Sequence, residues 1–243
     1  PSLEAAVHFA RNEWTASSRQ DAVLRVLSIP CCTGEEPYSL AMLLVQHGFP
    51  FTQVQIDGVD ISRMALRRAE QGDFGEHSFR GMDVAVRQRF FKKQGKTYQI
   101  DPALRSGVRF RHENAADPTF LPNEPMYDII FCRNLLIYFT EQARKNLLSN
   151  LSRLLHKNGR LFVGHSELGL VRAQGWSMLN IPRVFCSEHP DRSREKNKAT
   201  ERAPAPSKFR TVLAAKKCGT AITRINLPPQ ADFNGTSDTN IRQ

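Results

Sequence analysis

The residues best placed to do chemistry form a turn over residues 30–39, Pro-Cys-Cys-Thr-Gly-Glu-Glu-Pro-Tyr-Ser, which follows an apolar segment. A dinucleotide-binding turn needs the pattern G-x-G-x-x-G, and a P-loop needs G-x-x-x-x-G-K-S/T. This turn has one glycine, Gly34, and no lysine, so phosphate binding is disfavoured. Glu35 and Glu36 could attract a cationic ligand at the start of a helix, and a role limited to complementing the helix dipole is equally open.

Three further turns carry polar residues after apolar segments. Asp60 stands where Rossmann-like proteins place an acid that accepts hydrogen bonds from ribose hydroxyls, although it could also be a simple helix-terminal charge. Asn114 lies in a third turn, over residues 113–117. Arg133 follows a strongly apolar segment directly, and with Tyr138 it could grip a carboxylate by charge-assisted hydrogen bonds. The alternative is that Arg133 only bridges structural carboxylates.

The elements that must position these turns alternate along the chain. We expect strands over residues 24–30, 54–60, 108–113, 127–132 and 160–164. We expect helices over residues 37–47, 62–70 and 141–156, the second capped by Ser62 and the third stopped at Asn158-Gly159. Alternating strands and helices predict an α/β fold, with a mostly parallel sheet, helices on both faces, and ligands beyond the carboxyl ends of the strands.

Charge and composition divide the chain into three parts. The formal net charge is +10, but residues 190–243 alone hold 11 Lys and Arg against 5 Asp and Glu. We therefore expect a basic disordered tail over residues 190–243, a ligand-binding domain over residues 24–189, and the remnant of a connecting helix over residues 1–23. A net charge concentrated in a tail does not make the domain a nucleic-acid binder.

Membrane, secretory and metal-binding classes are disfavoured. No run of about 18 apolar residues exists, and the first residues do not have the layout of a signal peptide, so we expect a cytoplasmic protein without membrane insertion. The five cysteines are odd in number and form no C-x-x-C pair, which argues against a disulfide framework and against a zinc site. We expect no bound metal.

Three sequence blocks, in order, resemble the signature of the CheR-type chemoreceptor glutamate methyltransferases. They are Thr-Gly-Glu-Glu-Pro-Tyr-Ser at 33–39, Phe-Cys-Arg-Asn with Ile-Tyr-Phe at 131–139, and Gly-His-Ser-Glu at 164–167. Three ordered blocks are far more specific than any one of them. Residues 30–33, 60–62 and 158–163 are most similar to the branch that acts in Wsp-type surface-sensing systems, the WspC-like branch.

The resemblance implies a class I methyltransferase fold, a Rossmann-like sheet that binds S-adenosyl-L-methionine. It implies that Glu35 lies near the methionine ammonium of the cofactor, that Asp60 binds the ribose, and that Asn114 with Ala115 borders the adenine. Thr33 and Gly34 belong to the same cofactor-binding turn, and Asn134 flanks the methionine portion. Arg133 and Tyr138 are implied as the catalytic pair that flanks the transferable methyl group.

The implied reaction is transfer of a methyl group to glutamate side chains in the cytoplasmic domain of a methyl-accepting chemoreceptor, by a monomeric enzyme. An acceptor glutamate is already ionised at neutral pH, so no general base is needed. Two alternatives are a nucleic-acid methyltransferase, which would use the basic tail, and a catalytically impaired cofactor-binding regulatory module. Enzymes of this family begin with a small helical domain and a Phe-Phe-Arg stretch, and we expect this chain to start after them.

Overall fold

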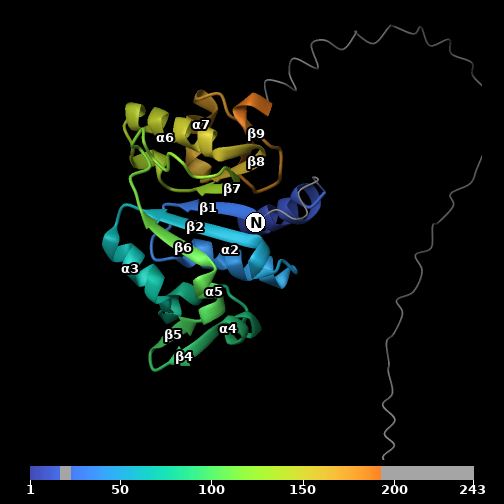
Figure 1. The fold of residues 1–243 in the computed structure, drawn as a ribbon, viewed down its shortest axis with the longest axis vertical. Coiled ribbons are helices and arrows are strands. Elements are labelled where there is room, and N and C mark those ends of the chain that lie inside the picture. Colours follow the sequence, from blue (N-terminus) through green and yellow to red (C-terminus); the bar gives the residue numbers. More distant parts are fainter. Residues whose placement is uncertain (17–22, 193–243) are drawn as a thin grey trace, which may run out of the picture. The chain divides into compact units, whose positions relative to one another are not determined.

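The core of the fold is a seven-stranded sheet with the order β6-β2-β1-β7-β8-β10-β9, seen in a computed structural model that describes residues 1–16 and 23–192 (Figure 1). Its strands are β1 (Leu24–Ile29), β2 (Val54–Asp60), β6 (Val108–His112), β7 (Tyr127–Cys132), β8 (Leu155–Val163), β9 (Ser177–Met178) and β10 (Cys186–Glu188). The strands from β6 to β8 are parallel, while β10 and β9 are antiparallel. The predicted mostly parallel sheet is confirmed.

Strand β7 shows why the sheet forms. All six of its residues are buried, as expected for a continuous apolar strand that is covered on both faces. Alternate residues point to opposite faces, so Ile129 and Phe131 join one core while Ile130 and Cys132 join the other. The two cores are the physical reason that helices are needed on both sides of the sheet.

Different helices supply the two cores. Helices α1 (Ser2–Phe9) and α2 (Glu35–Gln46), with the π-helical turn Ala10–Trp14, contribute to the first. Helices α6 (Glu141–Leu154) and α7 (Leu168–Ala173) cover the opposite face (Figure 1). Helix α3 (Arg63–Gln71) follows β2 and begins as predicted, because the Ser62 side chain accepts a hydrogen bond from the amide of Ala65.

The predicted end of the long helix is wrong. Helix α6 ends at Leu154, and β8 begins at Leu155, so the Asn158-Gly159 pair lies inside the strand and does not stop the helix. A Cβ atom at Gly159 would lie 2.8 Å from the Asp128 carbonyl oxygen. Gly159 therefore permits close approach of β8 to β7, and its absent side chain is a packing requirement of the sheet.

A second, three-stranded sheet was not predicted. Its strands are β3 (Asp73–Phe74), β5 (Thr97–Ile100) and β4 (Phe91–Gln94), in that order, and all are antiparallel. The short elements Glu76–Phe79, α4 (Val84–Phe90) and α5 (Pro102–Ser106) accompany it. Edge-to-face contacts of Phe79 with Phe91 and Tyr98 hold it together, with ring centroids 4.8 and 4.9 Å apart.

An ion-pair network centred on a buried aspartate joins the middle of the large sheet to the segment before β7. The carboxylate of Asp57, on β2, is fully buried and accepts hydrogen bonds from the Arg109 guanidinium at 2.8 Å and from the Tyr127 hydroxyl at 2.6 Å. Glu124 pairs with Arg25 and Arg109, both at 2.7 Å. The network fixes the long β6–β7 connection against the strands that it leaves and enters.

Three short helical turns complete the fold, at Phe51–Gln53, Leu136–Tyr138 and His165–Glu167. The turn at 136–138 precedes α6, and the turn at 165–167 precedes α7. Of the predicted tail, residues 190–192 are described and are helical; the rest lies outside the described residues, as do residues 17–22 of the predicted connecting helix. No helix in the described ranges is long and apolar enough to cross a membrane.

Candidate active site

The turns singled out in the sequence meet at one edge of the sheet. Register places Ile29 opposite Cys132 and Cys132 opposite Val163, so β1, β7 and β8 end level with one another. On the other side of β1, the last residue of β2, Asp60, lies opposite His112 at the end of β6. The segments 30–34, 61–62, 113–117, 133–138 and 164–167 therefore leave the same edge of the sheet, where α/β proteins bind ligands.

Asp60 accepts hydrogen bonds from the backbone of the first turn and of its own turn. Its carboxylate accepts hydrogen bonds from the Cys32 amide at 2.9 Å and from the Ser62 amide at 2.8 Å. Two carboxylate oxygens offer about four acceptor positions, so these bonds leave acceptors for ribose hydroxyls. Asp60 is 7% exposed, and it thus joins the β1 turn to the β2 turn from a sheltered position.

Gly34 is required by the shape of the same turn. Its φ of +95° lies in the left-handed region that glycine adopts without penalty, and the preceding turn residue Cys32 also has a positive φ, +48°. A Cβ atom at Gly34 would lie 3.1 Å from the Cβ atom of Ala69 in α3. The glycine therefore permits both the turn and the close approach of α3.

The two adjacent glutamates face different surroundings. Glu35 accepts a hydrogen bond from the Thr33 hydroxyl at 2.6 Å and one from Ser78 at 3.3 Å. Glu36 accepts a bond from the Ser28 hydroxyl at 2.8 Å, on the neighbouring strand. Both glutamates lie in the first turn of α2, where a negative charge is favoured.

Glu36 also pairs with Arg133, which the sequence analysis had not connected to it. The guanidinium Nη1 lies 3.1 Å from the Glu36 carboxylate, whose side chain is 20% exposed. Burial raises the pKa of Glu36 above its ordinary value, although the bonds from Ser28 and Arg133 act in the opposite direction. Arg133 therefore bridges to a carboxylate of the first turn, as one of the two interpretations of this residue proposed, and the carboxylate is that of Glu36, which was considered only as a charge at the start of a helix.

The segment after β7 is held by a buried acid. Asn134 has a φ of +58°, and the amides of Asn134, Leu135 and Leu136 all donate to the Glu167 carboxylate, at 2.7 to 2.9 Å. Tyr138 ends this segment with 79% of its surface exposed. Arg133, Asn134 and Tyr138 therefore belong to one anchored turn at the edge of the sheet.

Helix α6 holds the third turn. The Asn114 side chain accepts a hydrogen bond from the Ala116 amide at 3.1 Å, so it shapes its own turn. The buried Asn150 side chain donates to the carbonyl oxygens of Ala115 at 3.0 Å and Asp117 at 2.7 Å. The turn implied to border an adenine ring is thus fixed from the helix, through its backbone.

Two exposed apolar residues follow Asp60 closely in the sequence. Ile61 is 66% exposed and Met64 is 67% exposed, which is unusual for large hydrophobic residues close to a turn with several charges. The sequence analysis missed them. The signal was available, because Ile61 stands between Asp60 and Ser62, and Met64 lies in a segment with three arginines, residues 62–68.

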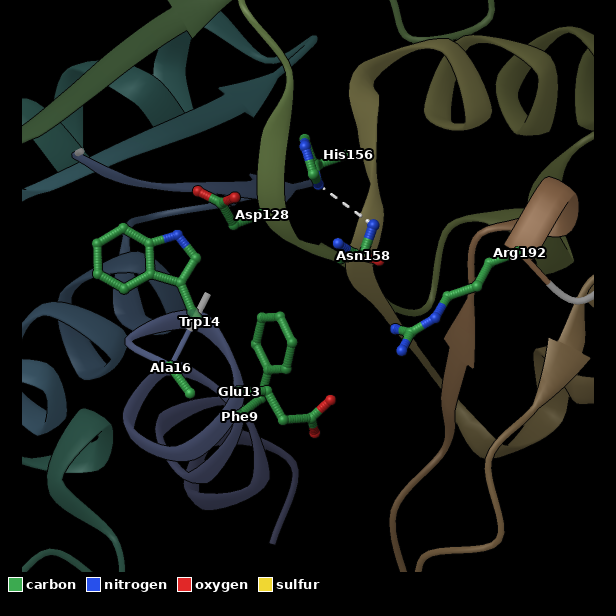
Figure 2. A pocket seen from close by; sticks show the side chains of 8 residues that line it. All are labelled: Phe9, Glu13, Trp14, Ala16, Asp128, His156, Asn158 and Arg192. Carbon is green, nitrogen blue, oxygen red and sulfur yellow. Dashed lines mark hydrogen bonds between the residues drawn. The ribbon is translucent and has the colours of Figure 1, made fainter. Parts of the chain in front are cut away.

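A separate pocket of about 330 Å³ lies at the opposite ends of the strands (Figure 2). Asp128, near the start of β7, and His156 and Asn158, near the start of β8, line it together with Phe9 and Trp14 from the amino-terminal segment. None of the site residues expected from the sequence lines this pocket. The candidate site is therefore at the carboxyl ends of the strands.

Comparison with known proteins identifies the family of the chain. Residues 2–181 match the family model described as CheR methyltransferase, SAM binding domain. The chain is 40% identical over 177 residues to the probable biofilm formation methyltransferase WspC of Pseudomonas aeruginosa, covering 71% of this chain and 42% of that protein. It is 35% identical over 170 residues to chemotaxis protein methyltransferase 2 of Vibrio cholerae, covering 69% and 56%. The chain thus spans about half the length of these relatives.

A solved structure supports the same fold at low sequence identity. The crystal structure of DszA carbon methyltransferase aligns with a TM-score of 0.50 and 12% identity, over 77% of this chain and 52% of that one. At this identity the likeness concerns the fold alone, a class I methyltransferase sheet.

The residues at the edge of the sheet fit the family's cofactor, S-adenosyl-L-methionine. Asp60, Glu35 and Glu36 suit the hydroxyl groups and positive charges of this phosphate-free nucleoside. Exposed Ile61 and Met64 offer an apolar surface for a base, and the described residues contain no group of side chains that could hold a metal ion. By its sequence and its fold the chain belongs to the CheR methyltransferase family, and residues 2–181 are its SAM-binding domain.

Proposed function

We propose that this protein transfers the methyl group of S-adenosylmethionine to glutamate side chains in the cytoplasmic domain of a chemoreceptor-like protein. The product is a glutamate γ-methyl ester, and the reaction takes place in the cytoplasm. Support comes from the family match, from the relatives named as chemotaxis and biofilm methyltransferases, and from the arrangement of charges at the site. No nucleic acid and no metal takes part.

The observation that carries the proposal is the position of Arg133. Its guanidinium has five N–H donors, the bond to Glu36 occupies one of them, and its side chain is 41% exposed. A planar cation with remaining donors suits an acceptor carboxylate. Tyr138 follows in the same anchored turn, with its phenol exposed toward solvent. These two groups are assigned to orient the acceptor.

The chemistry is an in-line displacement. A carboxylate oxygen of the acceptor attacks the methyl carbon, an O–C bond forms, and the C–S bond breaks as the electron pair returns to sulfur. The sulfonium and the carboxylate neutralise each other, so the products are an ester and a thioether, and no proton moves. The protein's contribution is therefore to exclude water and to align the two reactants.

The acids of the site are assigned to the cofactor. In this proposal Glu35 and Glu36 face the cationic methionine portion, Asp60 accepts hydrogen bonds from the ribose, and Asn114 with Ala115 borders the adenine. Thr33 and Gly34 shape the turn around the cofactor, and Asn134 lies beside its methionine portion. Glu36 is added to the assignments made from sequence because it contacts Arg133.

Transfer of a radiolabelled methyl group tests the proposal. The chain is incubated with methyl-labelled S-adenosylmethionine and a chemoreceptor cytoplasmic fragment, and the product is treated with alkali. A glutamate methyl ester hydrolyses and releases volatile labelled methanol, whereas methylated amines and methylated nucleobases keep their label. The matched control is the same fragment with its acceptor glutamates replaced by glutamine.

Three other outcomes would contradict the proposal. Alkali-stable label in added RNA would identify a nucleic-acid methyltransferase. Cofactor binding without transfer to any acceptor would identify a regulatory module. Equal labelling of the glutamine-substituted fragment would show that the acceptor is not a glutamate.

A further inference from the structure

One motif of the sequence has no role in the assignments above. The block Gly-His-Ser-Glu at 164–167 follows β8, and its last residue is a carboxylate with no solvent exposure. An acid buried to this degree must find several hydrogen-bond donors or it would strongly destabilise the fold. The donors to Glu167 therefore indicate what the motif is for.

Four backbone amides at the candidate site donate to Glu167. One carboxylate oxygen accepts from Leu135 at 2.7 Å and from Leu136 at 2.8 Å. The other accepts from Asn134 at 2.9 Å and from Gly164 at 2.7 Å. A single side chain thus joins the turn after β7 to the turn after β8.

The turn after β7 depends on this contact. Asn134 adopts a left-handed φ of +58°, which costs energy in a residue other than glycine. Three consecutive amides, from Asn134 to Leu136, point toward one place, and such a cluster of N–H dipoles favours an anion at its centre. Glu167 supplies that anion, so it offsets both the strained backbone and the converging amides.

The first residue of the motif, Gly164, leaves room for the Glu167 carboxylate. A Cβ atom at this residue would lie 2.7 Å from the nearer Glu167 carboxylate oxygen. A side chain here would push the carboxylate away from the amides that it accepts from. The spacing of Gly164 and Glu167 in the block is thus the spacing needed to bring a carboxylate into the adjacent turn.

We infer that Glu167 is a positioning residue of the methyl-transfer site, which acts by holding the turn that carries Arg133, Asn134 and Tyr138. This inference rests on the proposed function only for the identity of the reaction. Glu167 is fully buried and acts through the backbone of the turn. Its contribution is to keep Arg133 within reach of Glu36 and to keep Tyr138 at the exposed end of the turn.

The substitution Glu167→Gln tests the inference in the 243-residue chain. Glutamine has one acceptor oxygen, so its amide group would face two of the four N–H donors. Hydrogen–deuterium exchange of the amides at 134–136 should accelerate by about tenfold or more, while exchange within β7 stays slow. The dissociation constant for S-adenosylmethionine, measured by isothermal titration, should rise by about tenfold or more.

The matched control is Asp57→Asn. Asp57 is also a fully buried carboxylate with several hydrogen bonds, but it holds the strands and the β6–β7 connection. This variant should lower the melting temperature and should leave both the exchange at 134–136 and the cofactor affinity of the folded protein unchanged. The comparison separates a local role from a general loss of stability.

A second variant can be used to test the inference if Glu167→Gln does not fold. Gly164→Ala keeps the carboxylate and its charge but displaces it by the contact described above, so it should also accelerate exchange at 134–136 and weaken cofactor binding. Unchanged exchange or unchanged affinity in folded Glu167→Gln or Gly164→Ala would overturn the inference. Binding of cofactor without any methyl transfer by the wild-type chain would refute the proposed reaction, while the exchange and affinity measurements would still decide the role of Glu167.

Discussion

Asp60→Ala should separate a structural role of this carboxylate from the cofactor-binding role that we propose for it. The first role is structural, because the substitution removes the acceptor of the Cys32 and Ser62 amides. An amide left without a partner in a sheltered turn costs about 1–3 kcal/mol of stability. The second, proposed role is cofactor binding, where loss of a hydrogen bond to a charged group costs about 1.5–3 kcal/mol. The dissociation constant for S-adenosylmethionine should therefore rise by about 10- to 150-fold.

Isothermal titration and urea unfolding measure the two effects on the same preparation. The matched control is Asp101→Ala, because Asp101 accepts a hydrogen bond from the Ala103 amide at 2.7 Å at the start of α5, outside the turns of the site. The control should cost about 0.5–2 kcal/mol of stability and should not change the dissociation constant. If Asp60→Ala lowers stability like the control and leaves cofactor affinity unchanged, Asp60 is only a structural residue and the reasoning is refuted.

Three further outcomes are expected. Burial opposes ionisation of Glu124, but hydrogen bonds from its arginine partners lower its pKa from 4.5 to about 2. The lowered pKa contributes at most about 3 kcal/mol to the free energy of unfolding above pH 4.5, and this contribution is lost as the pH falls toward 2. Glu124→Gln should therefore flatten this part of the pH profile of stability, measured by urea unfolding. Asn150→Ala leaves two carbonyl oxygens without their donor and should lower the free energy of unfolding by about 1–3 kcal/mol. It should also weaken cofactor binding, measured by isothermal titration. Unchanged affinity would show that helix α6 does not support the cofactor site. Arg133→Ala should abolish most methyl transfer, while Tyr138→Phe, which removes one hydroxyl, should cost less in the same radiolabel assay; the reverse order would contradict the assignment of Arg133.

The parallel core of the fold could be predicted because its signals are local. The segment 127–132 is apolar except for Asp128 and is followed directly by Arg133 and Asn134, and the structure contains that strand with the same bounds. The expected bounds of β2, residues 54–60, are also those of the structure. Burial on both faces leaves a direct mark on composition, and Ser62 as a cap depends only on residues three positions apart.

The small antiparallel sheet could not be predicted in the same way. Strand β4 reads Phe-Lys-Lys-Gln, with three exposed residues, so it shows no alternation of apolar and polar side chains. Its stability comes from contacts of the Phe79 ring with the rings of Phe91 and Tyr98, which are well separated from Phe79 in the sequence. The end of α6 was misread for a related reason, since Gly159 serves the packing of β8 on β7.

The site was predictable in its location more than in its contacts. Polar residues after apolar strands predicted that these turns share one edge of the sheet, and the structure brings the turns together there. The sequence analysis weighed Glu35 and Glu36 equally, and the resemblance favoured Glu35; only the fold shows that Glu36 contacts Arg133, 97 positions away. The anchoring acid Glu167 was visible as part of a motif, but the amides that it accepts from carry no signature in the sequence, because every residue except proline has one.

Two turns of the candidate site are held by hydrogen bonds to their backbone groups. Glu167 accepts from amides and Asn150 donates to carbonyls, so neither depends on which side chains the two turns carry. Substitutions at the exposed positions Ile137 and Tyr138 can therefore alter what the protein recognises while the turn keeps its conformation, provided that no proline removes a bonded amide. To redirect the proposed methyl transfer to a new acceptor, these exposed positions are the ones to randomise, and the two buried anchors are the residues to leave unchanged.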